Sequence, residues 1–171
     1  GVAHTTVQRY LDVLTETFMV RQLPSWRENI GKRQVKAPKV YIRDSGLLHA
    51  LLGLSTSREI ESHPKVGASW EGFAIDAVVS RLGARPEECF FWATHSGAEL
   101  DLLVVRGEAR LGFEFKRTTT PALTRSMHIA AEDLRLHRLW VVHAGTRGFD
   151  LATNIRAVAI GRILDDLAPL Q

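Results

Sequence analysis

The chain has 171 residues, a formal net charge of +3 and 45% hydrophobic residues, and this composition excludes a wholly disordered or collagen-like protein. No apolar run approaches the roughly 18 residues that a membrane span requires. A single cysteine, Cys89, excludes an intramolecular disulfide and a thiolate zinc site. A reducing cytoplasm is the expected location. Because residues 1–4 contain neither a starting Met nor a signal peptide, we expect a fragment of a longer chain.

Positive charge is concentrated early in the sequence. Seven cations and one anion lie between Arg21 and Arg43, whereas residues 44–171 carry 14 cations and 16 anions. This basic stretch is typical of a surface that binds a nucleic-acid backbone through salt-sensitive contacts. A solvated basic linker is the alternative. The residues predicted to contact nucleic acid are Arg27, Lys32, Arg33, Lys36 and Lys39.

The first 35 residues are predicted to form a separate N-terminal unit. Apolar residues at helical spacing predict a helix from Thr5 to about Val20, and a short extended segment then ends at Pro24. Residues 26–38 show no clear period. We therefore divide the chain near Lys36, into residues 1–35 and 36–171.

Helices are expected at the start of the second unit. Residues 40–42 are typical of a short strand, and a helix capped by Asp44 should follow it, with a loop over residues 54–65. A second helix is predicted from about Val66 to Leu82, and its apolar row extends back onto Glu71. Because burial of a lone charge is costly, Glu71 should lie at the wet edge of that row or face a cation.

The remaining sequence is predicted to be mostly β structure. Thr120-Pro121 is expected to open a helix, and an apolar strand should follow over residues 139–142. Short segments at 158–160 and 162–167 complete the chain. Before these elements come three predicted strands, Cys89–Ala93, Glu99–Val105 and Arg110–Lys116.

The second and third of these strands are predicted to form a hairpin that brings carboxylates together. If residues 107–108 are the centre of a type II′ turn, paired residue numbers sum to 215, so Asp101 faces Glu114 and Glu99 faces Lys116. Like charges opposite one another destabilise a sheet unless a cation lies between them. Lys116 could supply that charge, and so could Mg²⁺ or Mn²⁺, which prefer such oxygen ligands. The alternative is the ordinary polar face of a one-sided sheet.

Several other reactive or aromatic side chains are predicted to be structural. Cys89 begins an apolar strand, where a buried, inert thiol is expected. Trp70, Phe73, Trp92 and Trp140 lie in apolar patterns and are predicted to be core residues rather than platforms for base stacking.

The order of the acidic residues resembles the PD-(D/E)xK nuclease superfamily. A helix carries Glu71, a strand carries Asp101, and Glu114-Phe115-Lys116 follows on the next strand. Over about residues 39–145 the chain also resembles the nuclease-like domain of unknown function at the C-terminus of many prokaryotic AAA-type ATPases. The segments that carry this second resemblance are VYIRDSGLL at 40–48, WEGF at 70–73, FWATHSGAELD at 91–101 and EFKRT at 114–118.

The resemblance implies an α/β (α+β) fold. The expected architecture is a restriction-endonuclease-like mixed sheet flanked by helices, preceded by a winged-helix remnant in residues 4–26. In that family a P-loop ATPase domain comes before the winged helix and would be a partner of this domain. Because the chain contains no Walker motif, ATP is not expected to bind this fragment, although the full-length protein is expected to bind it.

The resemblance also implies the roles of the site residues. Asp101, Glu114, Glu71 and the main-chain carbonyl of Phe115 would bind Mg²⁺ or Mn²⁺, and Lys116 would position the attacking water or stabilise the transition state. The first hypothesis is therefore a metal-dependent nuclease that cuts DNA. The second is a non-catalytic nuclease-like module that binds DNA or protein for a larger ATPase. Retention of the four side chains favours the first hypothesis.

Overall fold

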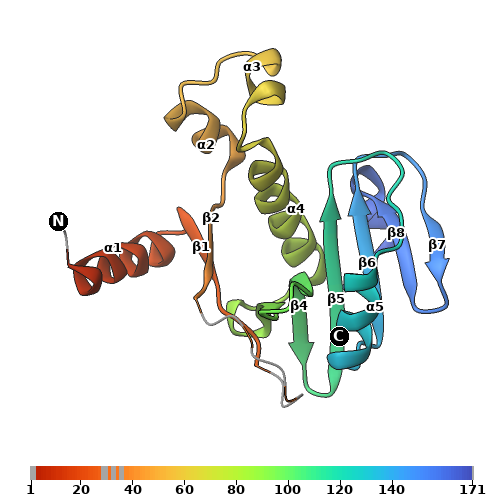
Figure 1. The fold of residues 1–171 in the computed structure, drawn as a ribbon. Helices are drawn as coiled ribbons and strands as arrows, with labels where there is room; N and C mark the ends of the chain where they lie inside the picture. The colour runs from red at the N-terminus through yellow and green to blue at the C-terminus, as the bar shows by residue number, and fades with distance from the viewer. Residues whose placement is uncertain (1–2, 28–30, 32–33, 35–36, 171) are drawn as a thin grey trace.

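The structure is a computed structural model that describes residues 3–27, 31, 34 and 37–170. In this part of the chain a six-stranded mixed sheet is flanked by helices, and a separate two-stranded ribbon lies nearer the N-terminus (Figure 1). The helices are α1 His4–Glu16, α2 Ser45–Leu51, α3 Ser57–Ser62, α4 Val66–Leu82, α5 Arg125–Asp133 and α6 Ile163–Asp166. The strands are β1 Val20–Leu23, β2 Lys39–Ile42, β3 Cys89–Ala93, β4 Glu99–Arg106, β5 Ala109–Lys116, β6 Arg138–His143, β7 Phe149–Ala152 and β8 Ile155–Ala159.

The main sheet has the strand order β3-β4-β5-β6-β8-β7. β5, β6 and β8 are parallel, and the other neighbouring pairs are antiparallel. Side chains alternate between two hydrophobic clusters: Val142 of β6 packs in the cluster with α4 and α6, whereas Val141 packs in the cluster with α5. Helices therefore cover both faces of the sheet, as expected for a sheet with a parallel centre.

α4 is the predicted helix that carries Glu71, with the predicted bounds. Its buried row includes Ile75, Val78 and Leu82, so the helix is held by apolar contact with the sheet. It ends at Gly83, which has a left-handed conformation with φ of +63°, a conformation that glycine adopts without a steric penalty.

The β1–β2 ribbon joins residues from both sides of the predicted boundary. Val20 pairs with Ile42 and Leu23 pairs with Lys39. Leu23 is fully buried in the α4 cluster, so β1 is anchored to the main sheet. The predicted boundary at residues 35–36 lies outside the described residues, and the division into two units stays a prediction.

Four local predictions differ from the structure. The predicted helix from Thr5 to about Val20 ends at Glu16, because the chain turns at Phe18, which has a left-handed φ of +61°, and Val20 begins β1. Residues 54–65 are not all loop, because α3 forms there with a capping box between Thr56 and Glu59; α3 buries no residue, so it has no apolar row to reveal it. The third large helix begins at Arg125 rather than at Thr120-Pro121, because Thr124 is extended and its hydroxyl accepts the N–H of Met127. β7 was not predicted.

The expected burial of aromatic and cysteine side chains is largely confirmed. Trp92 is fully buried, and Trp70 and Trp140 pack half-buried against the core. Phe73 is a correction: it is 46% exposed, because it lies on the side of α4 turned away from the sheet core. Cys89 is buried, and burial raises the pKa of its thiol to about 11. No helix in the described ranges has the length and apolar character needed to cross a membrane.

The predicted cap of α2 provides a test of the local fold. The Asp44 carboxylate accepts the N–H of Leu47 at 2.6 Å. We expect Asp44→Ala to lower the free energy of unfolding by about 1 kcal/mol, the usual contribution of an N-cap, as measured by urea denaturation. Asp44→Ser, which can still cap, should stay within a few tenths of a kcal/mol of wild type. Equal loss in both variants would contradict the capping role.

Candidate active site

The β4–β5 hairpin has the predicted register. Paired residues run from Leu102–Phe113 to Arg106–Ala109, and the two residue numbers of each pair sum to 215. The two-residue turn begins at Gly107, whose φ is +58°, as a type II′ turn requires.

Beyond Leu102 the hairpin departs from the prediction. In the β3–β4 pairing, Phe90 faces Leu103 and Trp92 faces Leu100, so β4 contains one extra residue there, which is a β-bulge. The β4–β5 ladder ends at the pair Leu102–Phe113. The ladder therefore contains neither the predicted Asp101–Glu114 pair nor the predicted Glu99–Lys116 pair, and this part of the predicted register was wrong.

Bonds from side chains replace the missing pairs of the ladder. The backbone N–H of Phe115 donates to Asp101 Oδ2 at 3.0 Å. The backbone of Glu99 is bonded to Ser126 of α5, whose Oγ accepts from the Glu99 N–H at 2.9 Å and donates to its carbonyl at 3.0 Å. The bulge thus directs the Asp101 carboxylate across the end of the hairpin toward β5.

Asp101 and Glu114 form a pair of buried carboxyl groups. They are only 4% and 3% exposed, and they lie close enough for Asp101 to raise the pKa of Glu114. Burial and the neighbouring Asp101 raise the pKa of Glu114 to about 8, and Lys116 Nζ, 2.9 Å from Glu114 Oε2, offsets only part of this shift. For Lys116, burial alone would lower the pKa of the ammonium group, but Glu114, Asp101 and Glu99 together outweigh that effect and raise it.

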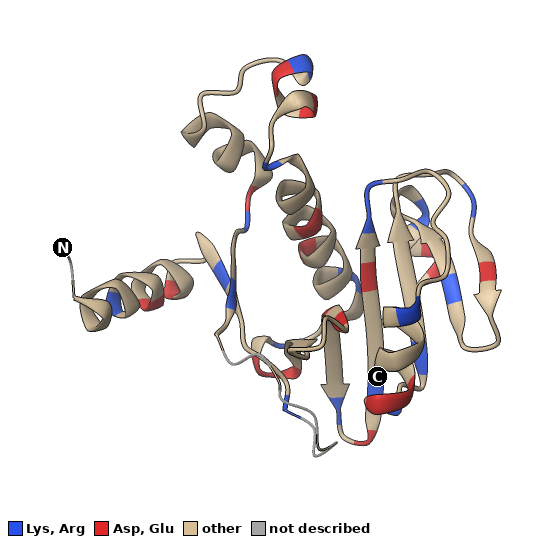
Figure 2. Cartoon of the chain, viewed as in Figure 1, with Lys and Arg blue, Asp and Glu red and all other residues tan. Residues whose placement is uncertain are grey.

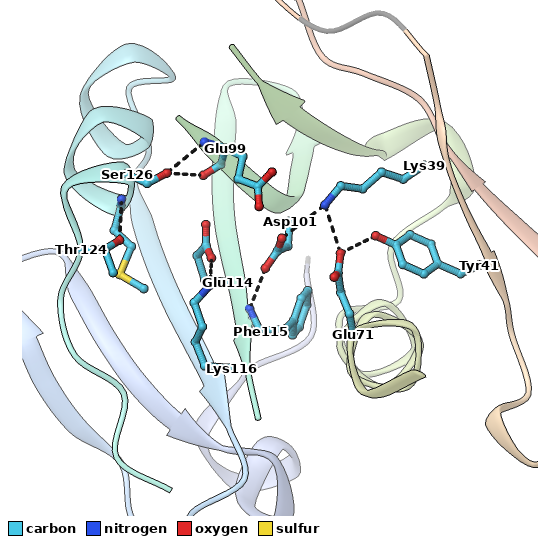
Figure 3. A network of polar contacts seen from close by, with 11 residues as sticks. Lys39, Tyr41, Glu71, Glu99, Asp101, Glu114, Phe115, Lys116, Thr124 and Ser126 are labelled. Carbon is cyan, nitrogen blue, oxygen red and sulfur yellow. Dashed lines mark hydrogen bonds and ion pairs between the residues drawn. The ribbon is translucent and has the colours of Figure 1, made fainter. Parts of the chain in front are cut away.

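β2 brings two further polar side chains to the carboxylates of Glu71 and Asp101 (Figure 3). Lys39 Nζ lies 3.1 Å from Glu71 Oε1 and 3.4 Å from Asp101 Oδ1, and the Tyr41 hydroxyl donates to Glu71 Oε1. Burial and the bond to Glu71 raise the pKa of Tyr41. Burial alone would lower the pKa of Lys39, but the carboxylates of Asp101 and Glu71 outweigh it and raise that pKa.

The four predicted site residues therefore lie in one region. Glu71 has a side chain that is 24% exposed and faces a cation, so it meets both expectations stated for it. Sequence reasoning missed Tyr41 and placed Lys39 among the nucleic-acid contacts. The Lys-x-Tyr spacing puts both side chains on one face of a strand, but it does not show that this face meets α4.

Three cations of the basic stretch form ion pairs with carboxylates, so their charge is partly neutralised: Arg21, Lys39 and Arg43. Lys32, Arg33 and Lys36 lie outside the described residues, and Arg27 is exposed. Arg21 forms an ion pair with Asp76, and Arg43 Nε lies 3.4 Å from the same carboxylate. In the described part of the chain, blue Lys and Arg positions and red Asp and Glu positions both occur on several elements, among them α1, α3 and α5 (Figure 2).

Two of the carboxyl groups at this site, those of Asp101 and Glu114, are suitable ligands for a hard divalent cation. Asp101 and Glu114 are buried and repel each other, a pair that a cation would stabilise, and Mg²⁺ is commonly held by one or two carboxylates with waters. The main-chain carbonyl of Phe115 lies beside them in sequence. Glu71 is bonded to Lys39 and Tyr41. Among the described residues no group of three or more His, Cys, Asp or Glu side chains is arranged to hold a metal, so the fit rests on Asp101 and Glu114.

Comparison with known proteins identifies the families that the chain matches. Residues 1–58 match a domain of unknown function, DUF8612, and residues 66–163 match a domain of unknown function, DUF4143. The chain is 48% identical over 163 residues to an uncharacterized protein of Mycobacterium bovis and to one of Mycobacterium tuberculosis. The match covers 95% of this chain and 36% of each relative, and no solved structure gives a significant match. Because the second match covers more than half of the chain, the protein belongs to the DUF4143 family.

Proposed function

We propose that this chain is a divalent-metal-dependent, nuclease-like domain of the PD-(D/E)xK type that hydrolyses phosphodiester bonds in DNA. One observation carries the proposal: two buried carboxyl groups, Asp101 and Glu114, meet at the end of a hairpin beside Lys116. If these two carboxyl groups had only a structural role, nearby cations would be expected to neutralise both of them fully. Here the pKa of Glu114 is raised instead, which is typical of a functional site.

Each of these residues has a chemical role in the proposed site. Asp101, Glu114, Glu71 and the Phe115 carbonyl would hold Mg²⁺ or Mn²⁺, which when bound lowers the pKa of a water and neutralises charge on a phosphate. Lys116 keeps its proton and has a side chain that is 40% exposed. Its ammonium group can therefore donate to a phosphate oxygen or orient the attacking water.

The domain is proposed to act within a longer protein. The chain spans about a third of the length of its mycobacterial relatives. In the family that the chain resembles, a P-loop ATPase domain precedes the nuclease-like domain. We propose that such an ATPase domain is its partner and that DNA is their shared substrate.

A second candidate function is a non-catalytic module that binds DNA or protein. Lys39 favours this reading, because its ammonium group already lies within ion-pair distance of Glu71 and Asp101. A module that had lost its metal would need such a cation to neutralise the buried carboxylates.

Metal binding and cleavage can be measured on the same samples to test the proposed function. Isothermal titration should show binding of Mn²⁺ and Mg²⁺, and plasmid, single-stranded or branched DNA should be cut only when the metal is present. Lys116→Met should lower the cleavage rate about 10²-fold, the scale expected for loss of one charged stabilising group, and should still bind metal. Lys65→Met, at the exposed lysine directly before α4, is the matched control.

The outcomes separate the two candidate functions. Cleavage that depends on both metal and Lys116 would support the nuclease. If a folded wild-type protein binds no metal at millimolar concentration, the catalytic proposal is wrong and the binding module remains.

A further inference from the structure

Lys39 lies in an unusual place for a residue of a basic stretch. Its ammonium group lies between the carboxylate of Glu71 on α4 and that of Asp101 on β4, at 3.1 Å and 3.4 Å (Figure 3). The Lys39 side chain is 26% exposed, and the ammonium group also lies 5.6 Å from the ring centre of Phe91. Lys39 thus links three elements at the site.

The arms of the ribbon are held differently. The β1 side continues into Pro24 and Trp26, which exchange two backbone hydrogen bonds with Phe91 of β3 at 3.0 and 2.7 Å. The contacts of β2 with the site are the side-chain bonds of Lys39 and Tyr41 to Glu71, and of Lys39 to Asp101. Lys39 can therefore change its position by side-chain rotation, without breaking the backbone attachment of the ribbon.

An ammonium group and a divalent cation compete for the same carboxylate. Both bind the negatively charged oxygens, and two cations held within a few ångströms repel each other strongly in a poorly solvated site. An oxygen of Asp101 or Glu71 bonded to Lys39 is a weaker ligand for a metal than the same oxygen without it.

We propose that Lys39 is a further residue of this site, which sets its metal affinity by competing with the divalent cation for Asp101 and Glu71. This inference rests on the metal site of the proposed function. Metal binding then displaces Lys39 toward solvent, and the freed ammonium group is left beside the site, where a DNA phosphate would lie.

The test measures metal affinity without DNA. Lys39→Met retains an unbranched stem beside Phe91 and removes the charge. We expect its Kd for Mn²⁺ in isothermal titration to be about tenfold lower than that of wild type. Lys39→Arg, which retains the positive charge, should show no such gain. Lys65→Met, the same substitution at an exposed lysine, reports the general effect of one lost charge, which salt screens.

A second measurement uses the wild-type protein, so the inference stays testable if Lys39→Met does not fold. Amine acetylation followed by mass spectrometry should label Lys39 several-fold faster with saturating Mg²⁺ than with EDTA, whereas labelling of Lys65 should not change. Faster labelling of Lys39 alone supports the displacement.

The possible results are distinct. Equal or weaker metal affinity in a folded Lys39→Met protein, or metal-independent labelling of Lys39, would overturn the competition while leaving the metal site in place. If wild type and Lys39→Met both bind no metal, the proposed metal site is wrong, and this inference is overturned with it.

Discussion

Asp101→Asn is expected to lower the rate of metal-dependent DNA cleavage roughly a thousandfold. This is the upper end of the rate loss seen when one group that stabilises the transition state is removed. Asn has nearly the same size, and its side-chain oxygen can still accept the N–H of Phe115 that Asp101 accepts at 3.0 Å. The local fold should therefore persist. What is lost is one of the two buried charges available to bind a metal, so titration calorimetry should also show weaker binding of Mn²⁺.

A matched control separates this effect from a general change of charge. Asp165 is exposed on α6, and Asp165→Asn should cleave at the wild-type rate. If Asp101→Asn also cleaves at that rate, the activity belongs to another site or another protein, and the assignment of Asp101 is wrong.

Glu114→Gln is expected to stabilise the metal-free domain at alkaline pH. The folded-state pKa of Glu114, about 8, lies above the usual value for the unfolded chain, so the folded state binds more protons between those two values. The stability contributed by the protonated group is present at low pH and is lost as pH rises through about 8. Gln resembles the protonated carboxyl group and stays uncharged at every pH.

Urea denaturation with EDTA at pH 5 and pH 9 measures this effect. Wild type should lose stability between the two values, and Glu114→Gln should exceed it at pH 9 by on the order of a few kcal/mol. At pH 5 the two proteins should differ little. Glu108→Gln, at the exposed turn, is the matched control and should follow wild type.

Two results would contradict this account of Glu114. If wild-type stability does not change from pH 5 to pH 9, Lys116 neutralises Glu114 fully and the pair is an ordinary ion pair. If Glu114→Gln is less stable than wild type at pH 9, the ionised carboxylate contributes to folding. In the proposed site, Mn²⁺ at pH 8 should raise the stability of wild type more than that of Glu114→Gln, because a ligand stabilises the state that binds it.

One of these variants is expected to lose activity and the other to gain stability, although both change the same pair of carboxyl groups. Asp101 and Glu114 are buried close to each other, and this arrangement costs stability when only Lys116 and Lys39 balance them. In a metal site both carboxyl groups are needed as ligands. In a module without metal, replacing one of them would raise the stability of the fold. The pH dependence of unfolding therefore bears on function without an activity assay.

Local patterns determined much of the architecture. The apolar row and Gly83 predicted α4 over its observed bounds, and the turn at Gly107 predicted the β4–β5 register wherever the two strands are paired. Both predictions depend on contacts between residues close in sequence, where backbone geometry leaves few alternatives. The order of Glu71, Asp101, Glu114 and Lys116 along these elements carried the family resemblance that predicted that they would meet.

Only the tertiary structure decided which cations and N–H groups contact the carboxylates of the site. The bulge in β4 depends on pairing with β3, and it turns Asp101 toward the Phe115 N–H. Lys39 and Asp101 are 62 residues apart, and no periodicity of β2 indicates which face of the ribbon meets α4. Such contacts depend on how separate elements pack, and a pattern within one element carries no information about its distant neighbour. The sequence thus predicted the carboxylates, and only the packed structure showed that a lysine of the basic stretch lies between two of them.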